Sequence, residues 1–149
     1  MTPRWTCRPF DALTVRELYG ILALRQAVFV VEQRCAFLDC DGWDARAEHL
    51  FCRGDDGEVA AYCRLFAPGV KCDECCIGRV VTAASSRRSG LGRALMREAL
   101  DRLATSHPEA PVRLGAQSYL ERFYASFGFA RCSDDYLEDG IPHLDMRRV

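Results

Sequence analysis

Three arginines and two glycines lie together where a predicted strand is followed by a predicted helix. The segment runs Gly78-Arg-Val-Val-Thr-Ala-Ala-Ser-Ser-Arg-Arg-Ser-Gly-Leu-Gly-Arg93 and contains Arg87-x-x-Gly90-x-Gly92. Glycines here let successive backbone amides turn toward one point, where they and the positive end of the helix attract a phosphate. A turn that only lets helix and strand pack closely has the same pattern. The segment lacks Gly-Lys-Ser/Thr and GxGxxG, which excludes a Walker loop and a dinucleotide fold.

The cysteines show no framework spacing. There are nine, an odd number, spread from Cys7 to Cys132, and we expect free thiols. Cys72-x-x-Cys75 supplies only half of a tetrahedral zinc site, so no metal is expected. Asp39-x-Asp41-Gly42-x-Asp44 is similar to a calcium loop but has no Glu at its twelfth position, and it is interpreted as an acidic turn.

Composition indicates one domain spanning residues 1–149. Nearly half of the residues are apolar, and the net charge is −1, which excludes a generally basic nucleic-acid-binding surface. The first ten residues have no signal-peptide core, and no apolar run is long enough to span a bilayer. We therefore expect a cytoplasmic protein with no nucleic-acid or membrane partner.

Periodicity places these residues on a mixed α/β arrangement. Thr14-x-x-Glu17 is a capping box that opens a helix to about residue 29, and apolar spacing predicts a second helix over 91–106. A short helix is expected over 120–127, with Gly128 as its left-handed cap. Strands are expected at 5–10, 49–53, 59–66, 76–82, 112–116, 129–136 and 143–147, with turns at Asp55-Asp56-Gly57 and Asp139-Gly140. The three strands between the first two long helices suggest an antiparallel meander.

Taken together, the motifs resemble the GNAT acetyltransferase superfamily. The resemblance rests on Arg87-x-x-Gly90-x-Gly92 after a strand and Phe123-Tyr124-x-x-Phe127-Gly128-Phe129 after the next strand. The chain is further similar to the ElaA family in the stretches Leu24-Arg25-x-x-Val28-Phe29-Val-Val-Glu32-Gln33, Asp39-x-Asp41-Gly42, Leu114-Gly-Ala-Gln117 and Glu138-Asp-Gly-Ile-Pro-His143.

The resemblance implies the acyl-CoA N-acyltransferase fold, an α+β mixed, mostly antiparallel sheet splayed between the two strands that surround the cofactor. The cofactor would be acetyl-coenzyme A, with its pantetheine arm against backbone groups of Val80, Val81 and Thr82. The side chain of Gln117 stands where the superfamily often has Asn. The pyrophosphate would contact the turn itself, formed by Arg87, Arg88, Ser89, Gly90, Leu91, Gly92 and Arg93.

The resemblance also implies direct transfer of the acetyl group to an amine. Tyr124 matches the general acid that protonates the leaving thiolate, and its alternative role is packing in an aromatic cluster. A free alkylammonium must lose a proton before attack, and Glu32 is preferred as the base over His49 and His143. His49, Glu138 and His143 are also expected to contact the acceptor.

The acceptor is expected to be a small-molecule or peptide amine. Acidic residues in the segments that flank the acceptor end favour a cationic amine, namely Glu32, Asp39, Asp41, Asp44, Glu48, Glu138 and Asp139. The alternatives are a catalytically silent coenzyme A sensor and an enzyme related to acyl-homoserine lactone synthases. An exposed edge strand would allow a homodimer.

Overall fold

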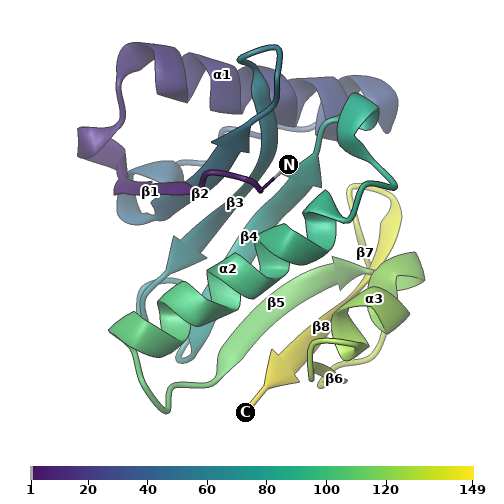
Figure 1. The fold of residues 1–149 in the computed structure, drawn as a ribbon. Helices are drawn as coiled ribbons and strands as arrows, with labels where there is room; N and C mark the ends of the chain where they lie inside the picture. The colour runs from purple at the N-terminus through teal and green to yellow at the C-terminus, as the bar shows by residue number, and fades with distance from the viewer. Residues whose placement is uncertain (1) are drawn as a thin grey trace.

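A mixed sheet of eight strands forms the centre of the structure, a computed structural model that describes residues 2–149 (Figure 1). The strands are β1 (Thr6–Pro9), β2 (Glu48–Arg53), β3 (Val59–Phe66), β4 (Cys75–Thr82), β5 (Val112–Gln117), β6 (Ala130–Arg131), β7 (Tyr136–Glu138) and β8 (Ile141–Arg148). The α-helices are α1 (Val15–Arg25), α2 (Leu91–Ser106) and α3 (Glu121–Ala125). The remaining helical segments are η1 (Phe10–Ala12), η2 (Gln26–Glu32), η3 (Asp44–Arg46), η4 (Ala84–Ser86) and η5 (Ser118–Leu120). Across residues 2–149, no helix has the length and apolar character needed to cross a membrane.

The sheet has the order β1-β2-β3-β4-β5-β8-β6, with β7 also pairing with β8. Strands β2 to β4 form the expected antiparallel meander, β1 pairs antiparallel with β2, and β5 pairs antiparallel with β8. Only β4 and β5 run parallel, because α2 connects them as a crossover. The mostly antiparallel mixed sheet predicted from the sequence is therefore confirmed.

Helices cover both faces of this sheet (Figure 1). In β2, Leu50 packs in the same core cluster as α2, whereas the next residue, Phe51, packs with α1. In β3, Cys63 packs in the cluster that contains α2, and its neighbour Tyr62 packs in the cluster that contains α1. This period of two explains why β3 is buried along its whole length and consists of apolar residues apart from Arg64.

The first helix begins as predicted and ends differently. Thr14 accepts a hydrogen bond from the Glu17 amide, and the Glu17 carboxylate accepts one from the Thr14 amide, which confirms the capping box. The α-helix stops at Arg25 and not near residue 29, and the chain continues as the π-helix η2. The β-branched valines of η2 favour α-helix poorly, and π-helical turns are frequent at functional sites.

The single strand expected over 129–136 is not present in the chain after α3. It forms two short strands, β6 and β7, which pair with different parts of β8. Between β6 and β7 the backbone pairing with β8 is interrupted. There the Asp145 amide donates its hydrogen bond to the Ser133 hydroxyl and not to a backbone carbonyl. The turn into β8 is confirmed, with Asp139 and Gly140 both at positive φ.

Candidate functional site

Strands β4 and β5 separate after three residue pairs. Their register joins Cys75–Ile77 to residues 112–114 and covers no later residue of either strand. A bulge accompanies the separation: Tyr62 pairs with Val81 but Arg64 pairs with Gly78, so β4 holds one extra residue. Arg79 lies in this bulge with a left-handed φ of 51°. Bulges bend the strand that carries them, and this one leaves the side of β4 that faces β5 without a strand partner.

A cavity of about 990 Å³ occupies the space between the two strands. It lies at the upper end of the size range of small-molecule sites. Most residues predicted for the site line it, from both the cofactor and the acceptor sets: Glu32, Val80, Val81, Thr82, Arg87, Arg88, Gly90, Leu91, Gly92, Arg93, Gln117, Tyr124, Glu138 and His143. Ser89 and His49 do not line it. The fold thus brings residues from distant segments to one place.

The turn before α2 has the geometry of an anion site. Arg88 and Gly90 both have positive φ, at 63° and 83°, and alternation of this kind turns successive amides to one side. Gly90 caps the helix without a side-chain hydrogen bond, so the first amides of α2 stay free. The Ser89 hydroxyl donates to the Ser86 carbonyl, and Ser89 does not line the cavity. The residues present therefore fit a diphosphate through backbone amides.

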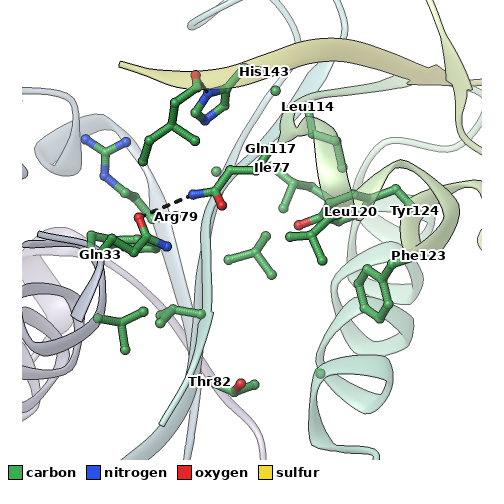
Figure 2. Close-up of a pocket in the computed structure, with 18 of the residues that line it drawn as sticks. Gln33, Ile77, Arg79, Thr82, Leu114, Gln117, Leu120, Phe123, Tyr124 and His143 are labelled. Atoms are coloured by element: carbon green, nitrogen blue, oxygen red, sulfur yellow. Dashed lines mark hydrogen bonds between the residues drawn. The ribbon is translucent and has the colours of Figure 1, made fainter. Parts of the chain in front are cut away.

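Tyr124 lies on the short helix α3, and its hydroxyl points into the gap between the strands (Figure 2). The side chain is only 5% exposed, and within residues 2–149 no group forms a hydrogen bond with its hydroxyl. Burial raises the pKa of Tyr124 well above its usual value near 10, which keeps the phenol protonated at neutral pH. The ring also packs edge-on against Phe123 and Phe129. Both roles predicted for Tyr124 are therefore compatible with its position.

The π-helix η2 and the residue after it make two polar contacts across the cavity. Glu32 accepts a hydrogen bond from Arg87 at 2.7 Å, which connects η2 to the turn before α2. Gln117 Nε2 donates to Gln33 Oε1 at 3.3 Å, across the gap between the strands (Figure 2). Glu32, the preferred base from sequence, therefore pairs with a residue predicted to contact phosphate.

His143 and Glu138 form a second polar pair, at the other end of the cavity. His143 Nδ1 lies 2.8 Å from the Ile141 carbonyl, which can only accept, so Nδ1 carries the proton. The lone pair is left on Nε2, which lies 3.4 Å from the Glu138 carboxylate. The ring projects from β8 toward Gln117, its partner in the β5–β8 register (Figure 2). The arrangement can accept a proton on Nε2.

His49 lies in the core and away from the cavity, contrary to the expectation that it contacts the acceptor. It is 1% exposed, its Nε2 donates to the Asp44 carbonyl, and its Nδ1 accepts from the Tyr62 hydroxyl at 2.7 Å. Burial lowers the pKa of His49, which keeps the ring neutral. Both ring nitrogens are thus engaged in hydrogen bonds, which connect the loop that contains Asp44 to Tyr62 of β3.

Three aspartates of the predicted acidic turn are neutralised by arginines. Each carboxylate pairs with two guanidinium groups and each guanidinium with two carboxylates, at 2.6 to 3.3 Å, which closes a ring. The ring consists of Arg25, Asp39, Arg79, Asp41, Arg64 and Asp44. Burial by itself raises the pKa of Asp41 and Asp44, but hydrogen bonds from Arg64 and Arg25 outweigh it and hold both well below their usual values.

This ring gives residues 39–44, interpreted from the sequence as an acidic turn, a structural role. Arg25 and Arg64 are fully buried, Asp39 and Asp44 are buried with them, and Asp41 closes the ring from an exposed position. Isolated buried arginines would be unstable without these partners. These carboxylates therefore contribute no net negative charge at the acceptor end, and the electrostatic argument for a cationic acceptor loses three of its residues.

The cysteines differ from expectation at one position. Cys72 and Cys76 form a disulfide, with Cα atoms 6.7 Å apart, because the turn that begins at Gly69 brings Cys72 beside the start of β4. The other seven cysteines are free. Within the described part of the chain, no three His, Cys, Asp or Glu side chains are grouped as metal ligands.

Two charged residues of the cavity were not predicted from the sequence. Arg79 lines the cavity because of the β4 bulge, which no local pattern indicates. Lys71, in the turn before β4, lines it as well. The sequence could have drawn attention to Lys71, because it is the only lysine among the chain's 20 lysine and arginine residues.

The chain is similar to known proteins in both sequence and fold. A family model described as an acetyltransferase (GNAT) domain matches residues 41–149. Protein ElaA of Escherichia coli is 39% identical over 145 residues, covering 97% of this chain and 95% of that protein. A UPF0039 protein of Synechocystis is 38% identical and covers 98% of this chain and 95% of its own length. A solved acyl-CoA N-acyltransferase from Pseudomonas aeruginosa is 41% identical, with a TM-score of 0.94 over 99% of this chain and 100% of its own.

Proposed function

This chain belongs to the GNAT acetyltransferase family, and within it to the ElaA family, and we propose that it transfers the acetyl group of acetyl-coenzyme A to an amine. The observation that carries the proposal is the cavity between β4 and β5. It is bounded at one end by the free amides of the turn before α2 and contains the unpartnered hydroxyl of Tyr124. A phosphate group and a departing anion would each find a donor there.

The chain's own groups suggest how coenzyme A would be held. Amides of the segment from Arg88 to Arg93 would bind the pyrophosphate, and the free edge of β4 at Val80, Val81 and Thr82 would pair with the amides of the pantetheine arm. Bound there, acetyl-coenzyme A supplies the thioester carbon that the amine attacks and the sulfur that leaves when its bond to that carbon breaks.

Tyr124 acts in this proposal as the proton donor to the leaving sulfur. Its hydroxyl is free, points into the gap, and is protonated at neutral pH. The raised pKa makes complete proton transfer to a thiolate less favourable, so Tyr124 stabilises the developing negative charge first through a hydrogen bond. The proton then passes to the sulfur, which leaves as a thiol, and the phenolate of Tyr124 takes a proton from solvent.

His143 acts as the proton acceptor for the amine, in preference to Glu32. The lone pair of His143 Nε2 is available, and the Glu138 carboxylate at 3.4 Å stabilises the ring once it is protonated. Glu32, by contrast, is already paired with Arg87. The proton on His143 then passes to solvent, which restores the resting state.

The proposal is tested in two steps. Isothermal titration calorimetry measures association with coenzyme A, and a thiol-release assay with acetyl-coenzyme A then measures turnover over a panel of amines. We expect saturable binding and amine-dependent thiol release that is much slower in Tyr124→Phe. Absence of any heat of association would overturn the proposal, and binding without turnover of any amine would favour a coenzyme A sensor.

A further inference from the structure

The chain contains one lysine, Lys71, and its ammonium lies at the acceptor end of the cavity. The side chain extends over two aromatic faces, with Nζ 5.8 Å from the centre of the Trp43 ring and 5.7 Å from that of Phe66. Aromatic faces attract a cation but do not neutralise it. Lys71, an exposed residue, therefore presents its ammonium to the cavity beside these two rings.

Lys71 forms no ion pair of its own. Asp41, which acts on Lys71 from a distance, is already bonded to Arg64 and Arg79. No carboxylate of residues 2–149 lies within ion-pair distance of Lys71. Burial lowers the pKa of Lys71, and repulsion by Arg64 and Arg79 acts in the same direction, against the opposite effect of Asp41 and Glu138. An anion that entered the cavity beside Lys71 would relieve this repulsion.

The same end of the cavity also holds groups of the other sign. Glu138, Asp139 and His143 line it, and His143 Nε2 lies 3.4 Å from the Glu138 carboxylate. An ammonium or amine is favoured there, close to the proposed proton acceptor. The ring of ion pairs has three arginines and three aspartates and so no net charge. Apart from it, the acceptor end contains one ammonium, that of Lys71, and the carboxylates of Glu138 and Asp139.

We propose that the acceptor is a small amino acid, whose carboxylate pairs with Lys71 while its amine faces His143. The inference rests on the proposed function and specifies its substrate class. The acceptor is small because the same cavity of about 990 Å³ must also hold the pantetheine arm. This hypothesis differs from the cationic amine expected from the sequence, because that expectation counted aspartates that the arginines neutralise.

A direct test uses the fact that the chain has a single lysine. Protein labelled with 13C-lysine gives one ε-methylene NMR signal, and this signal reports Lys71 without any turnover. With the protein saturated in coenzyme A, we expect L-alanine, L-methionine and L-phenylalanine to shift the signal saturably. Ethylamine, 3-(methylthio)propylamine and phenethylamine, the same molecules without the carboxylate, should leave it in place. Equal shifts by both members of each pair, or none by either, would refute the proposal.

Kinetics provide the second readout. With acetyl-coenzyme A, we expect kcat/KM for each amino acid to exceed that of its decarboxylated partner at least about tenfold, mainly through KM, as one good ion pair allows. Lys71→Met should remove this preference, and Lys71→Arg, the matched control, should keep most of it. Circular dichroism verifies that both variants are folded.

Two kinetic outcomes would contradict the inference while leaving the proposed function intact. One is better turnover of spermidine or of the decarboxylated amines, and the other is turnover of peptides but of no free amino acid. Failure of the protein to bind coenzyme A would instead overturn the proposed function, and the NMR titration, repeated without coenzyme A, would still decide whether Lys71 binds carboxylates.

Discussion

Glu32 and Arg87 form an ion pair, with Oε2 and Nη1 2.7 Å apart, that joins η2 to the turn before α2. Both side chains are partly exposed, so the pair itself is weak. A diphosphate bound at the turn would compete with Glu32 for the same guanidinium. The residue preferred from sequence as the base is therefore paired with a residue of the proposed phosphate site.

Glu32→Gln should increase the affinity for coenzyme A, because it removes the competitor for Arg87. The expected gain is at most about fivefold, since exposed ion pairs contribute about 0.2–1 kcal/mol. The acidic limb of the pH profile of kcat/KM should be unchanged. Calorimetry and a pH–rate series measure the two effects.

The contrasting variant is His143→Gln, which should remove that acidic limb and lower kcat about 10²-fold or more, as loss of a general base does. Loss of the limb in Glu32→Gln with its retention in His143→Gln would return the base to Glu32.

Tyr124→Phe should lower kcat by about 10²-fold while leaving the affinity for coenzyme A nearly unchanged. The substitution removes only the hydroxyl and keeps the ring contacts with Phe123 and Phe129. Because burial raises the pKa of Tyr124, the wild-type phenol stays protonated up to at least about pH 10, and both proteins should show the same profile below that pH. A kcat equal to that of the wild type would restrict Tyr124 to packing.

Features that depend on neighbours in sequence were mostly predicted correctly, and features that depend on distant segments mostly were not. The capping box at Thr14 and the left-handed Gly128 involve neighbours within a few residues, and both were confirmed. The bulge at Arg79 depends on the register of β3 against β4, which no window of β4 contains. The pairing of Asp39, Asp41 and Asp44 likewise depends on arginines up to 40 residues away, so from sequence alone the aspartates were counted as negative charge near the acceptor.

Asp44→Asn should destabilise the native state by about 3–5 kcal/mol, because Asp44 joins the two fully buried arginines of the ring. The exposed Asp55→Asn serves as a matched control and should change stability by less than about 0.5 kcal/mol. Urea unfolding at neutral pH measures both. Similar values for the two variants would show that the ring contributes no more than a surface charge.

The ring also predicts the direction of the acid response. The pKa values of Asp41 and Asp44 are lower in the folded state, so their contribution is complete above the unfolded value near 3.9 and is lost as the pH falls through the folded values. Stability should therefore decrease below about pH 4. The decrease should be smaller in Asp44→Asn, which has already lost part of that contribution.

The disulfide predicts a thiol count. Protein unfolded without reductant should react with a thiol reagent at seven cysteines, and reduced protein at nine. Cys72→Ser should lower the free energy of unfolding by about 2 kcal/mol, the value expected for so short a closed loop. Nine reactive thiols in protein purified without reductant would show that the bond does not form in the compartment of origin.

Gly92 offers a test in which stability and binding change in opposite directions. A Cβ added there would lie 3.8 Å from Thr82 Cγ2 and 3.9 Å from Phe123 Cζ, which are ordinary contacts with residues on opposite sides of the cavity. Gly92→Ala should therefore fold and stabilise α2 by up to about 1 kcal/mol, because alanine favours helix over glycine. Its methyl group narrows the passage proposed for the pantetheine arm, so coenzyme A should bind about tenfold more weakly, and Gly92→Leu should block it further. If Gly92→Leu binds coenzyme A with wild-type affinity in calorimetry, the arm does not pass between Thr82 and Phe123, and the cofactor must enter the gap between β4 and β5 by another path.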